Sequence, residues 1–160
     1  MTAKKWGEVD AMAGFDPAPA TFEENGWVRN LHEEKVTSVI VMSKKYIEAN
    51  PSAPVSFLRA FNGAYDYYRT NVAQADQWFV EASKLTISAN ALAKAASVEP
   101  NLKAQDKAGI RIGFNEEDYK MLQDAADFIF NQGLVKTQVV MKDHIDMKYL
   151  QEALNSKSKQ

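Results

Sequence analysis

Residues 7–17, which read Gly-Glu-Val-Asp-Ala-Met-Ala-Gly-Phe-Asp-Pro, constrain the fold of this chain most. A helix ending over residues 2–6 is expected to stop at Gly7. An apolar run at 9–15 then predicts a buried strand, which requires parallel neighbours on both sides. Ligands in open α/β sheets bind at the carboxyl ends of strands, where Phe15 and Asp16 are expected. We therefore expect the sequence to enter an α/β fold in its middle.

Composition narrows the class of protein. The 160 residues are 46% hydrophobic and 25% charged, with a net charge of −2, as in an ordinary globular domain. A near-neutral chain without a long basic run argues against nucleic-acid binding. The longest apolar run, 39–42, is too short to cross a bilayer, and no signal-peptide core is visible.

Cofactor and metal chemistry have no recognisable signal. The absence of cysteine excludes disulfides, thiolate metal sites and cysteine nucleophiles. The two histidines, His32 and His144, do not form a known metal-binding spacing. We therefore expect no cofactor, no metal and no enzymatic activity.

Further strands are predicted by alternation and by β-branched residues. Residues 27–31 alternate in polarity, and 36–42 are rich in valine and isoleucine. A short strand at 110–114 and an extended segment at 134–140 are expected later in the chain.

Most of the remaining sequence predicts helices. Capping residues, helix-stopping Gly or Pro, and apolar spacings of three and four indicate seven segments. These are a short helix from Pro17 or Pro19 to Asn25-Gly26, 44–49 capped by Ser43, 52–70, 73–83, 86–96, a helix from Asn115 to Gly133, and one from Asp146 to about 154. A dense aromatic set is expected to pack between helices, although two members, Tyr67 and Trp78, can instead mark an exposed surface.

Five segments resemble the nitrate/sulfonate/taurine-type substrate-binding proteins of ABC importers. Each is a weak motif, but together they keep the family's order and spacing from about residue 3 to residue 154. They are residues 7–17, 39–51 (Val-Ile-Val-Met-Ser-Lys-Lys-Tyr-Ile-Glu-Ala-Asn-Pro), 57–61 (Phe-Leu-Arg-Ala-Phe), 126–135 and 145–150.

The resemblance implies an α/β, periplasmic-binding-protein-like (type II) fold that is incomplete. A few strands come first and mostly helices come after them. The family has two α/β lobes around a ligand cleft, and this chain resembles the C-terminal half. We expect 1–36 to end the second lobe, 37–155 to form the return crossing and C-terminal helices, and 156–160 to be a disordered tail. The first lobe is either absent, through truncation, or supplied by another chain.

The function implied by the resemblance is solute binding in the periplasm. The chain is expected to bind a small sulfonate-, nitrate- or taurine-like solute and pass it to an ABC permease after the cleft closes. With half of the contacts absent, we expect weak binding by the single chain and dimerisation that covers its exposed faces. No membrane insertion is expected.

The predicted ligand-binding residues are Phe15, Asp16, Pro17 and Ser38. The Phe15 ring can pack on a ligand, and the Asp16 carboxylate can accept hydrogen bonds from an amine or order a neighbouring Arg. Direct contact between Asp16 and the ligand would argue against a bare anionic solute, since like charges repel. Alternatively, Asp16 and Pro17 only start the next helix. The Ser38 hydroxyl can bind ligand oxygens near the hinge, or Ser38 is an ordinary strand residue.

Two other functions stay open. One is an enzyme resembling the pyrimidine-precursor synthases of thiamine biosynthesis, which is disfavoured because those relatives use a cysteine-rich motif. The other is a helical interaction module whose strands are incidental. Such a module predicts a helix-dominated circular dichroism spectrum and no stabilisation by small molecules.

Overall fold

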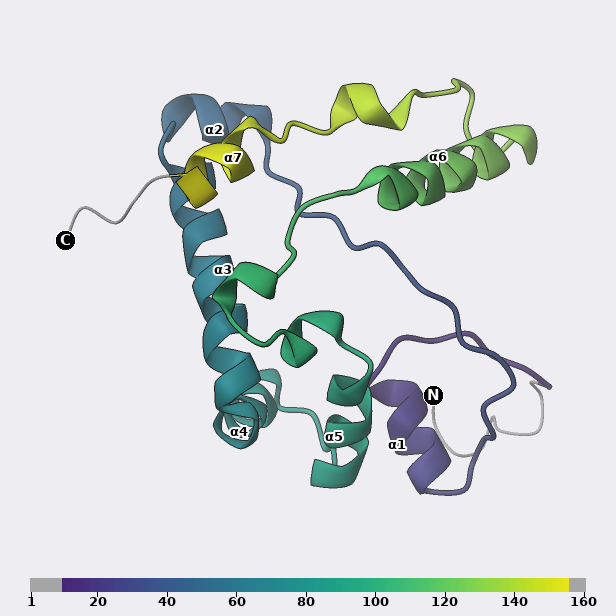
Figure 1. Cartoon of the computed structure of the whole chain (residues 1–160). Helices are drawn as coiled ribbons and strands as arrows, with labels where there is room; N and C mark the ends of the chain where they lie inside the picture. The colour runs from purple at the N-terminus through teal and green to yellow at the C-terminus, as the bar shows by residue number, and fades with distance from the viewer. Residues whose placement is uncertain (1–9, 156–160) are drawn as a thin grey trace. The chain divides into compact units, whose positions relative to one another are not determined.

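The computed structural model describes residues 10–155, and the regular elements within that range are all helices, joined by irregular segments (Figure 1). The predicted α/β fold is wrong, because no β-strand forms within the described residues. The α-helices are α1 (Ala18–Glu24), α2 (Lys44–Ala49), α3 (Ala53–Thr70), α4 (Val72–Ser83), α5 (Ala89–Ser97), α6 (Glu116–Asn131) and α7 (Lys148–Asn155). Between these helices, the described part of the chain has three 3-10 helices, η2 (Pro100–Lys103), η3 (Lys107–Gly109) and η4 (Met141–His144).

The α/β prediction is wrong because the segments predicted as strands do not form strands in the described part of the chain. Residues 10–15, 27–31 and 36–42 are irregular, as are 110–114, and 134–137 form bends. Val9 and the predicted helix end at 2–6 lie outside the described residues, as does the tail at 156–160. β-Branched residues favour a pleated surface that packs against neighbouring strands, and the preference is expressed only when such neighbours exist.

The irregular stretch at 36–42 has the composition of a strand but, within the described chain, no strand beside it. Val36 is 62% exposed and Val41 83% exposed. Thr37 ties the stretch to α6, since its hydroxyl lies 3.5 Å from Oδ1 of Asp118 and 3.2 Å from the sulfur of Met121. The apolar pattern of a strand is therefore present without the burial that a strand requires.

The predicted helices are confirmed, because their start signals are local. Ser43 caps α2 by accepting a hydrogen bond from the Tyr46 N–H at 3.2 Å. At α6, Asn115 and Asp118 form a reciprocal capping box, with both hydrogen bonds at 2.9 Å. These contacts lie within a few residues of chain and need no tertiary partner.

Helix α4 ends in a strained conformation at Lys84, whose φ is 57°. We expect Lys84→Gly to stabilise the chain by about 0.5–1 kcal/mol in thermal denaturation, because glycine adopts this left-handed region without a Cβ clash. Lys120→Gly, inside α6 on an exposed position, should instead destabilise by about 1 kcal/mol. A loss of stability in both variants would contradict the assignment of strain to Lys84.

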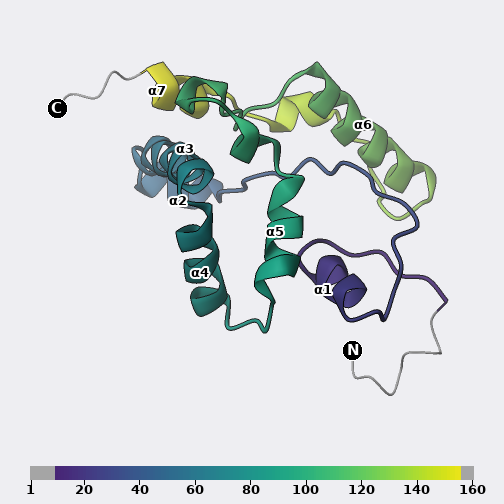
Figure 2. The same ribbon diagram turned by 60° about the horizontal axis from the view of Figure 1, so that its bottom comes forward.

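The described chain forms two compact units. Within the described residues, the first comprises 10–33 and Tyr68–Lys103. In it, α1 packs beside α5 (Figure 2) and buries small side chains, with Ala20 and Ala91 each 2% exposed and Leu92 6% exposed. An ion pair between Glu23 and Lys94 spans the same two helices.

The second unit comprises Glu34–Tyr67 and, up to the last described residue, 104–155. Here α6 lies alongside η4 (Figure 1), and the amide of Gln123 joins them. Its nitrogen donates to the Val139 carbonyl at 2.9 Å, and its oxygen accepts from the Met141 N–H at 2.8 Å.

The core of this second unit is small. Its buried apolar residues on α3, α6 and α7 are Val55, Ala126, Leu150 and Ala153. The packing leaves little spare room near α7, since a Cβ added at Gly113 would lie 2.8 Å from Cδ2 of Leu150. The unit therefore depends on few apolar contacts.

None of the helices in the described part of the chain has the length and apolar character needed to span a bilayer.

Candidate functional site

The predicted site residues at 15–17 form the entrance to α1. The Phe15 side chain is 74% exposed. One carboxylate oxygen of Asp16 accepts the Ala20 N–H at 3.2 Å, and Pro17 occupies the N-cap position. The alternative role of Asp16 and Pro17, starting a helix, is therefore observed. Both Phe15 and Asp16 are exposed, and their contact with a ligand stays a prediction.

Ser38 belongs to the second unit, whereas residues 15–17 belong to the first. It is exposed within the irregular stretch that Thr37 ties to α6. Neither unit by itself brings the four predicted residues together.

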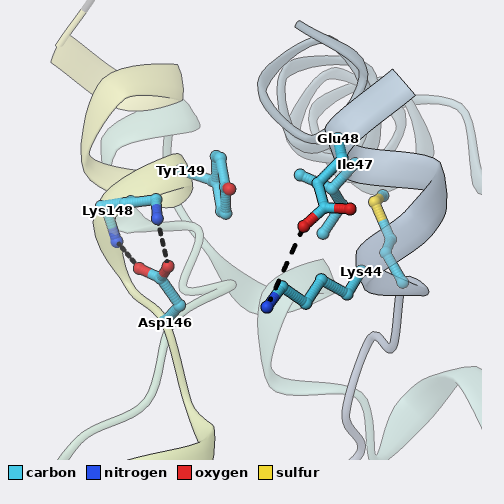
Figure 3. Close-up of a pocket in the computed structure, with 7 residues that line it drawn as sticks. Lys44, Ile47, Glu48, Asp146, Lys148 and Tyr149 are labelled. Carbon is cyan, nitrogen blue, oxygen red and sulfur yellow. Dashed lines mark hydrogen bonds and ion pairs between the residues drawn. The ribbon is translucent and has the colours of Figure 1, made fainter. Parts of the chain in front are cut away.

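A surface hollow of about 440 Å³ lies between α2 and the start of α7 in the second unit (Figure 3). We call it the α2–α7 hollow. Figure 3 shows Tyr149 between the two helices, with one ion pair on each side. Its lining residues are Met42, Lys44, Ile47, Glu48, Asp146, Lys148 and Tyr149.

The two ion pairs of the hollow differ in geometry. Asp146 accepts the backbone N–H of Lys148 at 3.0 Å and lies 2.7 Å from its Nζ. The Lys148 Nζ also lies 4.6 Å from the centroid of the Tyr149 ring. In contrast, Nζ of Lys44 is 3.9 Å from Glu48, and these side chains are 91% and 65% exposed. The Asp146–Lys148 pair is therefore the closer of the two, although its side chains are also 51% and 65% exposed.

The Asp146–Lys148 pair favours the charged form of both side chains. The hydrogen bond from Lys148 lowers the pKa of Asp146 below its usual value, and the Asp146 carboxylate raises the pKa of Lys148. Both groups stay ionised over the physiological pH range.

A smaller hollow of about 280 Å³ lies between α1 and α5 in the first unit. Its charged residues are Glu23, Glu24 and Lys94. The hydrogen bond from Lys94 lowers the pKa of Glu23, and Glu24 accepts a hydrogen bond from Ser88, which also caps α5. These groups are occupied in holding α1 against α5.

The sequence identifies the helix start at Asp146 but gives no sign of the hollow to which this residue belongs. The Lys44–Glu48 spacing of four is a readable signal for a helical ion pair. Nothing in the sequence signals that α2 and α7, about a hundred residues apart, line one surface. Within residues 10–155, no group of three or more His, Asp or Glu side chains is arranged to hold a metal ion.

Comparison with known proteins gives no relative: no protein-family model, no curated protein and no solved structure matches this chain.

Proposed function

We propose that this chain is the solute-binding component of an ABC-type importer in partial form. It binds a small sulfonate-, nitrate- or taurine-like solute in the periplasm and presents it to the permease. The proposal is carried by the five resembling segments, which keep the family's order over nearly the whole sequence. No catalytic step is part of it.

Several of the resembling segments coincide with helices of the structure. Residues 57–61 lie within α3, 126–131 within α6, and 148–150 within α7. The motif at 43–50 contains α2 with its Ser43 cap. The resembling segments that predict helices are therefore helical, although the lobes of the family are not formed.

A stretch of exposed apolar residues suggests that a partner chain covers this part of the protein. Val36, Val39, Ile40 and Val41 are 45–83% exposed along one short stretch. Large apolar patches on soluble proteins mark surfaces that another chain covers. We propose a second copy of this chain as the cover, because the near-neutral charge opposes self-association little.

Solute binding then acts by shifting a population. A solute that contacts both chains stabilises the closed arrangement over the open one. The permease recognises the closed form. In this proposal, within the first unit, the Phe15 ring stacks on the solute, Pro17 holds the turn, and the Asp16 carboxylate accepts a hydrogen bond from the ammonium group of a taurine-like solute.

The test combines solution mass with a thermal-shift screen against sulfonates, nitrate, amino acids and pyrimidines. A dimer whose melting temperature rises with one class of solute supports the proposal, because a ligand of the folded state stabilises that state. A monomer that no solute stabilises contradicts it.

Phe15→Ala is expected to weaken solute binding about tenfold without changing the melting temperature of the free protein. The ring is 74% exposed, so its removal costs little packing within the first unit. Phe128→Ala on α6, where the ring is 61% exposed, is the matched control and should leave affinity unchanged. Isothermal titration compares them, and equal affinities for both variants would remove Phe15 from the site.

A helical interaction module is the second candidate, favoured by the helical fold and by exposed aromatic residues on α4. Trp78 is 51% exposed and Phe79 43% exposed. Such a module requires no solute. It is distinguished from the first proposal by a dimer or complex whose stability is the same with every solute in the screen.

A further inference from the structure

The α2–α7 hollow presents both signs of charge from two separate helical segments. Lys44 and Glu48 come from α2, and Asp146 and Lys148 from the start of α7. These two ammonium and two carboxylate groups cancel in formal charge, so the hollow favours neither a bare anion nor a bare cation overall. We propose that this hollow binds a small zwitterion that carries one ammonium and one carboxylate group.

The α7 side of the hollow carries a closed ion pair, whose Lys148 and Asp146 side chains are 65% and 51% exposed. Asp146 is held by two contacts to Lys148, at 3.0 and 2.7 Å, and the Tyr149 ring lies against the same ammonium group. This side therefore offers a ligand an aromatic face beside charges that are already paired with each other.

The α2 side supplies the exchangeable partners. At 3.9 Å and with both side chains mostly exposed, the Lys44–Glu48 pair contributes little stability and opens at small cost. A zwitterion aligned antiparallel to this pair places its carboxylate at Lys44 and its ammonium at Glu48. The two charges of the ligand then replace one weak ion pair with two.

The remaining lining suits the carbon chain of such a ligand. Met42, Ile47 and Tyr149 line the hollow and are half-buried. The volume of about 440 Å³ is ample for a small amino acid and lies in the range of ligand pockets. Because the charges are exposed, we expect a dissociation constant on the order of a few millimolar.

This site is independent of the proposed solute site. Phe15, Asp16 and Pro17 belong to the other unit, and none of the four predicted residues lines the hollow. The zwitterion site can therefore fail while the proposed function stands, and the reverse also holds.

The experiment is a titration of the nitrogen-15-labelled chain with β-alanine, monitored by backbone amide chemical shifts. Propanoate and propylamine, which each carry one of its charges, are titrated at the same ionic strength. The proposal expects saturable shifts at residues 44–48 and 146–149 with β-alanine alone. Equal shifts with either single-charge compound, or no saturable shift with β-alanine, would overturn it.

A matched pair of variants locates the binding. Glu48→Gln should weaken β-alanine binding about fivefold, since one exposed charge contact is lost. Asp124→Asn removes the corresponding carboxylate from another exposed pair spaced by four residues, Lys120–Asp124 on α6, outside the hollow. Its affinity should equal that of the unaltered chain. An equal loss in both variants would show a general charge effect and refute the site.

Discussion

Leu150→Ala is expected to destabilise the second unit by about 2–4 kcal/mol. Leu150 on α7 is 7% exposed and is one of few buried apolar residues in that unit. Truncation removes apolar burial and leaves a cavity beside Gly113, whose backbone the side chain closely approaches. Urea denaturation monitored by circular dichroism measures the loss, with the first unit expected to keep its own transition.

Leu154→Ala is the control for this variant. Leu154 lies on the same helix but is 56% exposed. The same chemical truncation should then cost less than about 1 kcal/mol, because little surface leaves the core. Equal losses at the two positions would mean that α7 does not pack as described.

Asp118→Ala is expected to cost about 2–3 kcal/mol at neutral pH. Asp118 is 9% exposed, and its carboxylate accepts the Asn115 N–H at 2.9 Å, pairs with Arg111 and lies near the Thr37 hydroxyl. Removing it abolishes the capping box of α6 and the tie to residues 36–42. Asp124→Ala, a 63% exposed carboxylate on the same helix, should cost under about 0.5 kcal/mol.

The contribution of Asp118 depends on pH with a definite sign. Burial raises the pKa of this carboxyl, but hydrogen bonds from Asn115 and Arg111 outweigh burial and hold its pKa below the ordinary 3.8. A carboxyl group whose pKa is lower in the folded state than in the unfolded state stabilises the fold. This stabilisation is complete at a pH above the unfolded-state pKa, and it is lost as the pH falls through the folded-state pKa. The difference between the unaltered chain and Asp118→Ala should therefore shrink below about pH 4. A difference that stays constant in acid would contradict the ionised role of Asp118.

The helices could be predicted from sequence because their determinants are local. Ser43, Asn115 and Asp146 each accept backbone hydrogen bonds at the start of a helix, as their positions in the sequence indicate. Gly26 and Gly133, with φ of +68° and +70°, come after the ends of α1 and α6 as predicted. Such signals act over four or five residues.

The strands could not be predicted correctly because a β-strand is stabilised by hydrogen bonds and packing with other strands, which can be distant in the sequence. Residues 36–42 carry the β-branched pattern, yet the described chain offers them no ladder partner. Their Thr37 hydroxyl contacts a helix instead. The pattern indicates an apolar extended segment, and the inference of a sheet added partners that the described residues do not contain.

The candidate site divides in the same way. The sequence points to Phe15 and Asp16 through a turn, and the turn is present at the start of α1. The α2–α7 hollow could not be foreseen, because it joins residues 42–48 to 146–149 across about a hundred positions. Residues that are so far apart in the sequence meet through tertiary packing, which local sequence spacing does not predict.

By itself, the sequence determined the helices, their caps and the apolar extended stretches, since each depends on interactions between neighbours along the chain. The tertiary structure alone decided that no sheet forms among the described residues, that α1 pairs with α5, and that α2 and α7 share a charged hollow. These features depend on which distant segments meet. That choice is set by the burial and pairing of whole segments, which no local pattern encodes.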